Sequence, residues 1–477
     1  MDITKEKLSG KTRTEHDLLG NKEVPVEYYF GVQTMRAIEN FHISRVRLNM
    51  FPAFVNGLAI VKQAAAEANC ELGLLKPEIK DAIVNACKEI TSGKLHDQFV
   101  VDMVQGGAGT STNMNANEVI ANRALELLGH QKGEYKYCSP NNHVNMSQST
   151  NDAYPTAVRI ALLYRTRDLI DTLKKLVESF KKKSVEFADV IKMGRTQMQD
   201  AVPMTLGQEF GAYAATLSEE IDRLENNVKL FLEVNMGATA IGTGINSDPD
   251  YTPICIKHLQ QITGMPIVAA GNMIEATNDT GAFIMYSAAV KRLGVKLSKI
   301  SNDLRLLSSG PRTGFHEINL PPMQPGSSIM PGKVNPVIPE VVSQVAFKVV
   351  GNDMTVTMAV EAAQLELNAM EPIIVHCMFE SVEMLINGMN TLRERCIDGI
   401  TANKDRCRDL VYHSIGLVTA LNPYIGYEVS TELAKEALEQ NKGIYNLVLE
   451  KGIMSKEELD KILLPENMVK PRKFIKK

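Results

Sequence analysis

The chain has 477 residues, 44% hydrophobic and 23% charged, which is normal for a soluble globular protein. The net charge is −4, from 52 lysines and arginines against 56 aspartates and glutamates, so nucleic acid is not the expected partner. No apolar run approaches the ~18 residues that a membrane span needs, and residues 1–20 have no apolar core of a secretory signal. We therefore expect neither a membrane partner nor secretion.

The first part of the chain predicts an N-terminal domain over residues 1–146, built from short helices and loops rich in glycine and asparagine. The pattern favours helices at 54–72, 79–92 and 118–128. After Gly399 the pattern returns to short helices, which predicts a C-terminal helical domain over 400–477.

Between these domains, residues 147–399 carry much longer helical patterns. We predict helices over 152–190, 205–236, 272–307, 337–361 and 371–400. In the second of them, apolar residues from Leu206 to Phe231 recur at steps of three and four and mark one face. Strand-like alternation is scarce. The expected fold is therefore mainly all-α, with an elongated central five-helix bundle.

Cysteine and histidine usage gives no metal signature. The seven cysteines have no CxxC spacing, which favours reduced thiols in a cytoplasmic protein over a disulfide framework or a zinc site. The nine histidines form no HxxxH or HxH pair. We expect a cytoplasmic protein without a bound metal.

Four loops at the ends of helices concentrate hydroxyl and amide side chains. They are GGAGTSTNMNANEV (106–119), SQSTNDAYPT (147–156), MGRTQMQDAVPMTLGQE (193–209) and GSSIMPGKVNP (326–336). Helix capping is the simpler explanation for any one of them. Four together, with Lys333 and Arg195 among them, favour a carboxylate-binding site, because helix N-termini, neutral donors and a cation attract anions.

The predicted helix over 152–190 separates two of these loops. At ~1.5 Å per residue it would be ~58 Å long. The loop before it and the loop after it cannot meet in one pocket of one chain. If both serve one reaction, different subunits supply them, and activity requires an oligomer.

The loops do not match the common nucleotide-binding or serine-nucleophile motifs. GGAGTS lacks the GK[ST] ending of a P-loop and the strand context of a dinucleotide fold, and the serines at 327 and 328 do not lie in a GxSxG elbow. No histidine lies near Ser327 in sequence to act as its base.

The last of the four loops resembles the signature of the aspartase/fumarase superfamily, GSSxMPxKxNxxxxE, in full. The matching residues are Gly326, Ser327, Ser328, Met330, Pro331, Lys333, Asn335 and Glu340. The resemblance extends from residues 15–41 to residues 421–427. It is closer to the aspartase branch than to fumarases, which carry a Trp and a Gly-Ser-Gly in the stretch that corresponds to 96–119. It implies a homotetramer with a 20-helix core and composite active sites from three subunits.

The resemblance also implies the reaction, a reversible elimination of ammonia from the small dicarboxylate L-aspartate to give fumarate. A base removes the Cβ proton, and an aci-carboxylate intermediate forms. Ser327 resembles the base. The expected substrate-binding residues are Thr110, Ser149, Thr150 and Ser328 around the charge that develops, Thr196, Lys333 and Asn335 on the α-carboxylate, and Asn151 and Gln197 near the amino group. No cofactor is expected to be required, and the sequence does not indicate activation by a divalent cation.

A serine is a poor base unless its oxyanion is stabilised. The backbone N–H groups of Ile329 and Met330 and the nearby Lys333 are the expected stabilisers. Because Gly326 and Gly332 bracket this loop, we predict a mobile lid, with a rigid turn closed by Met-Pro-Gly as the alternative.

Several alternatives remain at this point. Gln197 stands where fumarases and some aspartases have histidine, and a glutamine cannot transfer a proton. Fumarate hydratase is the second candidate activity, and a non-catalytic, crystallin-like relative is a candidate of another class. Argininosuccinate and adenylosuccinate lyases share the core signature but fit the rest of the chain less well. We expect a structural role for Arg36 and a place for Glu340 in the first turn of a helix.

Overall fold

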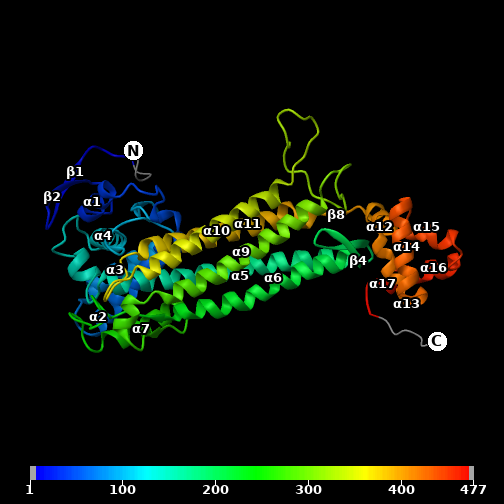
Figure 1. The fold of residues 1–477 in the computed structure, drawn as a ribbon. Helices are drawn as coiled ribbons and strands as arrows, with labels where there is room; N and C mark the ends of the chain where they lie inside the picture. The colour runs from blue at the N-terminus through cyan, green and yellow to red at the C-terminus, as the bar shows by residue number, and fades with distance from the viewer. Residues whose placement is uncertain (1–6, 472–477) are drawn as a thin grey trace. The chain divides into compact units, whose positions relative to one another are not determined.

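A computed structural model describes residues 7–471, drawn with their element labels in Figure 1. The outermost ends of the two predicted terminal domains, residues 1–6 and 472–477, lie outside the described residues. The chain divides into two compact units. Unit 1 comprises the chain up to Ile170, Asp222–Arg292 and Lys348–Met384, and unit 2 comprises Asp171–Ile221, Leu293–Phe347 and the chain from Leu385. The predicted division at residues 146 and 399 stays a prediction.

The five predicted long helices are all present, which confirms the mainly helical fold. They are α5 (Thr150–Glu186), α6 (Leu206–Val228), α9 (Gly281–Leu307), α10 (Val337–Glu361) and α11 (Glu371–Arg395). Helix α10 has the predicted ends. The others are shorter than predicted at one or both ends, except that α5 begins two residues earlier.

The early start of α5 places Pro155 in the second turn of the helix. Ser149 and Asp152 set this start, because Ser149 Oγ accepts from Asn151 N (3.2 Å) and Asp152 Oδ1 accepts from Ser149 N (2.9 Å). Pro155 has no N–H for the carbonyl of Asn151, four residues earlier. The buried Asn235 replaces it, since its Nδ2 donates to Asn151 O (2.9 Å).

Two further helix predictions were wrong at their ends. The helix predicted over 205–236 ends at Val228 and is followed by the 3₁₀ turn η4 (Lys229–Leu232) and strand β5 (Glu233–Val234). The helix predicted over 272–307 is interrupted, because Asp279 has an extended backbone between α8 (Met273–Asn278) and α9.

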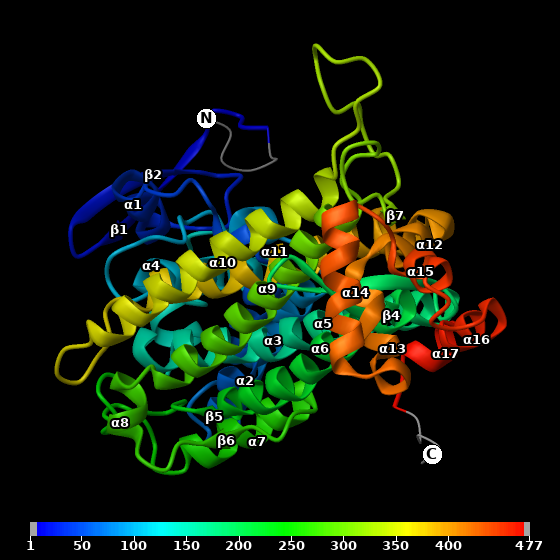
Figure 2. The same cartoon turned by 45° about the vertical axis from the view of Figure 1, so that its right-hand side comes forward.

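Unit 1 contains several shorter helices. They are α1 (Val32–Asn40), α2 (Pro52–Glu71), α3 (Pro77–Thr91), α4 (Thr110–Leu127) and α7 (Tyr251–Thr263), with the turns η1 (Leu48–Met50), η2 (His96–Gln98) and η3 (Pro140–Val144). Strands β1 (Thr12–Asp17) and β2 (Gly20–Pro25) form an antiparallel hairpin, and β5 (Glu233–Val234) pairs in parallel with β6 (Val268–Ala269) beside α7 (Figure 2).

Helix α2 lies at the centre of unit 1, packed against α3, α4 and α7. It is buried nearly all round, as expected for a helix that is apolar on every face. Phe54 stacks on Phe379 and meets the edge of the Tyr154 ring. This core joins α2 to the beginning of α5 and to α11.

Helix α4 begins at Thr110, eight residues before the predicted start at 118. Asparagine favours turns over helix interiors, so the Asn-rich stretch was predicted as a loop. That prediction was wrong because Asn113, Asn115 and Asn117 are buried and their amides have tertiary partners.

Unit 2 contains the hairpin of β3 (Ile191–Thr196) and β4 (Gln199–Thr205), in a stretch that was predicted as a loop. The β-strand pair β7 (Ile318–Asn319) and β8 (Thr401–Ala402) leads to the C-terminal helices. These are α12 (Lys404–His413), α13 (Val418–Ile425), α14 (Tyr427–Gln440), α15 (Ile444–Glu450), α16 (Lys456–Ile462) and α17 (Pro465–Met468), with the turns η5 (Ile397–Gly399) and η6 (Ile415–Leu417). They share a core with Met193 of β3, which explains why the hairpin is ordered.

Helices α9 and α10 are joined by a long connection, residues 308–336, which carries the signature loop. It projects away from the ends of these two helices, in yellow-green in both views (Figures 1 and 2). No helix within residues 7–471 has the length and apolar character that a membrane span needs. The seven cysteines form no disulfide with one another.

Candidate active site

The predicted site residues fall into two groups, one in each unit. Unit 1 holds the residues near the starts of α4 and α5, which are Thr110, Ser149, Thr150 and Asn151. Unit 2 holds the turn of the β3–β4 hairpin, with Thr196 and Gln197, and the signature loop from Gly326 to Asn335.

The loop before α4 has a left-handed backbone at three successive residues, Gly107, Ala108 and Gly109. At Gly109 a Cβ atom would lie 2.6 Å from the Tyr154 ring, so only glycine allows this contact with the start of α5. The tight loop turns Thr110 to the surface, where its hydroxyl donates to Gly107 O (2.8 Å). A substrate oxygen can take the place of that local acceptor.

Thr150 and Ser149 lie at the start of α5, where the helix dipole favours negative charge. Thr150 Oγ1 accepts a hydrogen bond from Asn113 Nδ2 (3.1 Å). Asp152, fully buried behind them, accepts from the backbone N–H of Gly237 (3.2 Å) and Thr239 (2.9 Å). Burial raises the pKa of Asp152 to about 6, although its N–H donors oppose the shift.

Asn151 is oriented by the same segment of unit 1. Its Nδ2 donates to Ala240 O (2.7 Å), which leaves Oδ1 as the end of the amide that can receive a ligand. An ammonium group is a donor only. The orientation of Asn151 therefore suits the amino group of a substrate.

A buried network that sequence reasoning missed lies directly behind this group. Its members are Lys62, Asn113, Asn117, Asn145 and Gln148, which bond to one another through their side chains. The one signal in the sequence was a lysine inside the apolar stretch AIVKQAAA, where a charged residue needs buried partners.

The β3–β4 turn of unit 2 consists of Gln197 and Met198, both with a left-handed backbone (φ 53° and 62°). A two-residue hairpin turn of this kind normally uses Asn-Gly. Non-glycine residues in this region cost free energy and concentrate at functional sites. The side chains of Thr196 and Gln197 are exposed and form no hydrogen bond within residues 7–471.

A buried cluster of charges supports this turn. Arg195 Nη1 pairs with Glu317 Oε1 (2.7 Å), Lys192 Nζ pairs with Glu317 Oε2 (3.0 Å), and the guanidinium of Arg195 stacks on the Phe315 ring, 4.2 Å from its centroid. Glu317 is fully buried, and Asn403 N donates to its carbonyl oxygen (2.9 Å). Arg195 is thus a structural residue of the hairpin, which frees its neighbour Thr196 for a ligand.

Ser327 lies in the signature loop with two backbone donors close to its hydroxyl. Its Oγ accepts hydrogen bonds from Ile329 N (3.1 Å) and Met330 N (2.9 Å). Two backbone N–H groups aimed at one hydroxyl oxygen stabilise a negative charge on that oxygen. The roles assigned to this and the other site residues stay predictions.

The signature loop is closed at its base. Gly326 N donates to Lys333 O (2.6 Å), and Asn335 Nδ2 donates to Gly326 O (2.6 Å). Beyond this closure, the side chains of Ser328 and Lys333 are exposed and have no partner in the part of the chain that the structure describes. A tied base with an exposed tip fits either a lid or a rigid turn, so the lid stays a prediction.

Two weaker candidates have structural places. Arg36 pairs with Asp17 through two hydrogen bonds, Nε to Oδ2 (2.7 Å) and Nη2 to Oδ1 (2.8 Å), which agrees with a structural role. The Arg36 donors hold the pKa of the Asp17 carboxyl below its ordinary value. Glu340 lies in the first turn of α10, as predicted.

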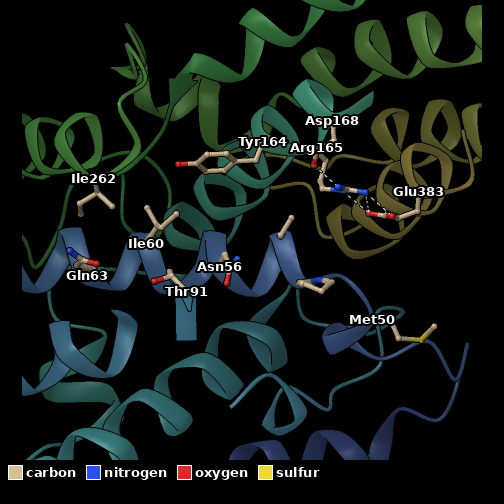
Figure 3. Close-up of a pocket in the computed structure, with 12 residues that line it drawn as sticks. Met50, Asn56, Ile60, Gln63, Thr91, Tyr164, Arg165, Asp168, Ile262 and Glu383 are labelled. Carbon is tan, nitrogen blue, oxygen red and sulfur yellow. Dashed lines mark hydrogen bonds and ion pairs between the residues drawn. The ribbon is translucent and has the colours of Figure 1, made fainter. Parts of the chain in front are cut away.

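A prominent cavity of unit 1 lies away from the predicted site residues. It has a volume of about 630 Å³ and lies between α2, α5 and α11 (Figure 3). Its charged groups satisfy one another, since Arg165 pairs with both Glu383 and Asp168. None of the predicted site residues lines it. Within residues 7–471, no cluster of His, Cys, Asp and Glu side chains could hold a metal ion.

Comparison with known proteins decides the family. The lyase family model matches residues 20–351, and the model of the fumarase C C-terminus matches residues 417–470. The chain belongs to the aspartase/fumarase superfamily. This confirms the resemblance of the signature loop.

Within the superfamily, similar relatives are named aspartate ammonia-lyase. The chain is 61% identical to that of Pseudomonas aeruginosa, over 97% of this chain and 98% of the relative. It is 56% identical to that of Escherichia coli, over 97% of each chain.

Solved structures of the superfamily share the fold. A fumarate lyase:delta crystallin from Brucella melitensis, described as bound to cobalt, is 55% identical with a TM-score of 0.94, over 97% of this chain and 100% of that chain. A class II fumarase from Schistosoma mansoni is 36% identical with a TM-score of 0.88, over 96% and 99%.

We predict that Glu317→Gln destabilises this superfamily member by about 3–5 kcal/mol, because it leaves Arg195 without its carboxylate and takes from the buried Lys192 one of its two carboxylate partners, Glu209 being the other. Urea unfolding at fixed protein concentration measures the loss. Asp189→Asn, which removes an exposed ion pair with Lys404, is the control and should cost less than ~1 kcal/mol. Equal losses would contradict the structural importance of the buried cluster.

We predict that Gly326→Ala lowers turnover far more than it lowers stability. A Cβ atom at this position would lie 2.7 Å from both Asn335 N and Lys333 O, so the base of the loop must open. Steady-state kinetics and thermal unfolding measure the two effects. Gly271→Ala, where a Cβ atom meets nothing within 4 Å, serves as the control. Wild-type kinetics in Gly326→Ala would show that the closure is dispensable.

Proposed function

We propose that this protein is an aspartate ammonia-lyase, a carbon–nitrogen lyase that converts L-aspartate into fumarate and ammonia. The observation that carries the proposal is the pair of backbone hydrogen bonds to Ser327 Oγ within the family signature. Identities of 56–61% to proteins of that name, over nearly the whole chain, support the same activity.

The first step moves the Cβ proton of the substrate to Ser327. The acidity of a free serine hydroxyl is far too weak for it to be an alkoxide at neutral pH, so its anion must be stabilised. The N–H groups of Ile329 and Met330 supply two hydrogen bonds, and the ammonium of Lys333 supplies charge in the same loop. The alkoxide then accepts the proton and becomes a neutral hydroxyl.

Loss of this proton leaves two negative charges on the β-carboxylate, in an aci-carboxylate. Donors that are oriented before the reaction stabilise such a charge, and the loss of one typically costs ~2.7–4 kcal/mol of barrier. Thr110, Ser149, Thr150 and Ser328 are the proposed donors. Three of them lie at the starts of α4 and α5, where the helix dipoles favour an anion.

The remaining residues bind the α-carbon substituents. Thr196, Lys333 and Asn335 are the proposed partners of the α-carboxylate, and Asn151 and Gln197 those of the amino group. When the carbon–nitrogen bond breaks, the protonated amine leaves as neutral ammonia and takes the bonding electrons with it. This departure needs no proton donor, so a glutamine at position 197 is sufficient. Each step uses a side chain or a backbone N–H, and we propose that no cofactor is required.

The proposed site is composite. Helix α5 joins the two groups of residues and has 37 residues, which at ~1.5 Å each make it ~55 Å long. We propose that three subunits of a homotetramer supply one site. An exposed apolar stripe on α10 supports assembly, because Phe347, Met354 and Met358 are 62–66% exposed along one helix. The seven free cysteines are consistent with a cytoplasmic protein.

We predict that the protein forms fumarate from L-aspartate, followed by ultraviolet absorbance, and acts poorly on malate, D-aspartate and larger succinyl amines. Ser327→Ala should lose nearly all turnover and still bind a substrate analogue, because it removes only the base. Ser308→Ala, outside the site, should behave as the wild type. Turnover of malate but not aspartate would identify a hydratase, no turnover at all would favour a crystallin-like relative, and an active Ser327→Ala would exclude this serine as the base.

We predict that Met354→Glu dissociates the oligomer and abolishes turnover together, because it places a charge in the apolar stripe of α10. Analytical ultracentrifugation and the fumarate assay measure the two effects. Leu438→Glu, at an exposed apolar residue of α14, is the matched control and should change neither. A monomer with full activity would contradict the composite site.

A further inference from the structure

Lys62 is fully buried in the middle of α2. Its Nζ donates to three amide oxygens, Asn113 Oδ1 (2.7 Å), Asn145 Oδ1 (3.0 Å) and Gln148 Oε1 (2.8 Å). An ammonium group has three N–H donors and no acceptor. All three donors are therefore used, and each amide must face Lys62 with its oxygen.

This arrangement decides which end of the Asn113 side chain faces the predicted site. Because Oδ1 faces Lys62, Nδ2 is the end that donates to Thr150 Oγ1 (3.1 Å) and to Asn145 Oδ1 (3.1 Å). The Thr150 oxygen is then an acceptor, and its own proton is free for another group. Within residues 7–471 this hydroxyl donates to no protein atom.

With the opposite orientation of the Asn113 amide, the Thr150 hydroxyl could not donate its proton to a substrate. If the amide turned over, Oδ1 would face Thr150 and accept the proton that a substrate oxygen needs. The two ends of an amide have nearly the same shape, so packing does not choose between them. The charge of Lys62 favours the observed orientation, because the reversed amide would place its N–H donors against the N–H donors of the ammonium. Asn145 Oδ1, itself bound to Lys62, favours the same orientation by accepting from Asn113 Nδ2.

Holding the loop in place does not by itself explain a buried charge. Burial of an ammonium costs free energy, and it lowers the pKa of Lys62 to about 7 against the opposing charge of Asp152. Asn69, further along α2 and equally buried, holds the same loop without charge. It donates to Met146 O (3.1 Å) and accepts from Ser147 Oγ (2.7 Å).

We propose that Lys62 is a positioning residue for the elimination reaction, which orients Asn113 so that Thr150 donates its proton to the substrate carboxylate. The inference rests on the proposed function, because it assigns Thr150 to the charge that develops on that carboxylate. Lys62 itself touches no reacting atom. Lys62 acts on Thr150 through the side-chain amide of Asn113.

A double-mutant cycle on the full-length enzyme tests the proposal. Lys62→Met should lower kcat by on the order of 10²-fold, the effect of one lost donor, with little change in KM. Thr150→Val should have a similar effect. The double variant should be no slower than Thr150→Val alone, because both changes remove the same donated proton.

Asn69→Leu is the matched control, since it removes hydrogen bonds to the same loop from the same helix. It should lower the thermal midpoint while kcat stays near that of the wild type, and any effect on kcat should multiply with that of Thr150→Val. If Lys62→Met does not fold, Asn113→Leu replaces it. That variant keeps Lys62 with two partners, and it should show the same loss and the same lack of additivity.

The proposal is overturned if Lys62→Met or Asn113→Leu keeps wild-type kcat, or if their effects multiply with that of Thr150→Val. It is also overturned if Asn69→Leu loses as much kcat as Lys62→Met, which would indicate a structural role alone. If the unmodified enzyme is active on L-aspartate but the effects on kcat multiply, only the positioning role of Lys62 is rejected. An unmodified enzyme without turnover on L-aspartate rejects the proposed function and this inference with it.

Discussion

A buried polar group is costly unless it has a partner, and both groups of predicted site residues are built on such groups. In unit 1 the ammonium of Lys62 is enclosed by three amide oxygens. In unit 2 Glu317 holds two cations behind the hairpin. These clusters fix the exposed donors in front of them, which would otherwise choose among many rotamers.

The backbone of the site loops also depends on the contacts around it. Several non-glycine residues with left-handed conformations lie in the site loops, at Ala108, Ser147, Gln197 and Met198. Each conformation is unfavourable for a residue with a Cβ atom. They persist because the surrounding contacts over-determine the loops, and the result is a set of short side chains held at the surface by rigid elements below them.

Much of the fold could be read from the sequence, because the apolar periodicity of a long helix averages over many residues. Helix α10 was predicted to the residue, and the signature loop was recognised from eight fixed positions. The start of α4 and the β3–β4 hairpin were missed, since both depend on tertiary partners of Asn113, Asn115 and Met193. Lys62 was missed for the same reason. The partners of this lysine come from distant segments of the chain, so the sequence alone does not identify them.

The start of α5 carries a consequence for the order of folding. Pro155 has no N–H to donate to Asn151 O, and Asn235, 84 residues after Asn151, donates to it instead. Asp152 and Asn151 also bind residues 237–240. Local helix formation therefore leaves this end incomplete until the later segment docks. A nascent chain that has not yet emerged as far as residue 240 would hold the helix with a frayed first turn. Thr150 would be in place only after residues 235–240 have docked, so the protein acquires its anion-binding end after most of the helix itself.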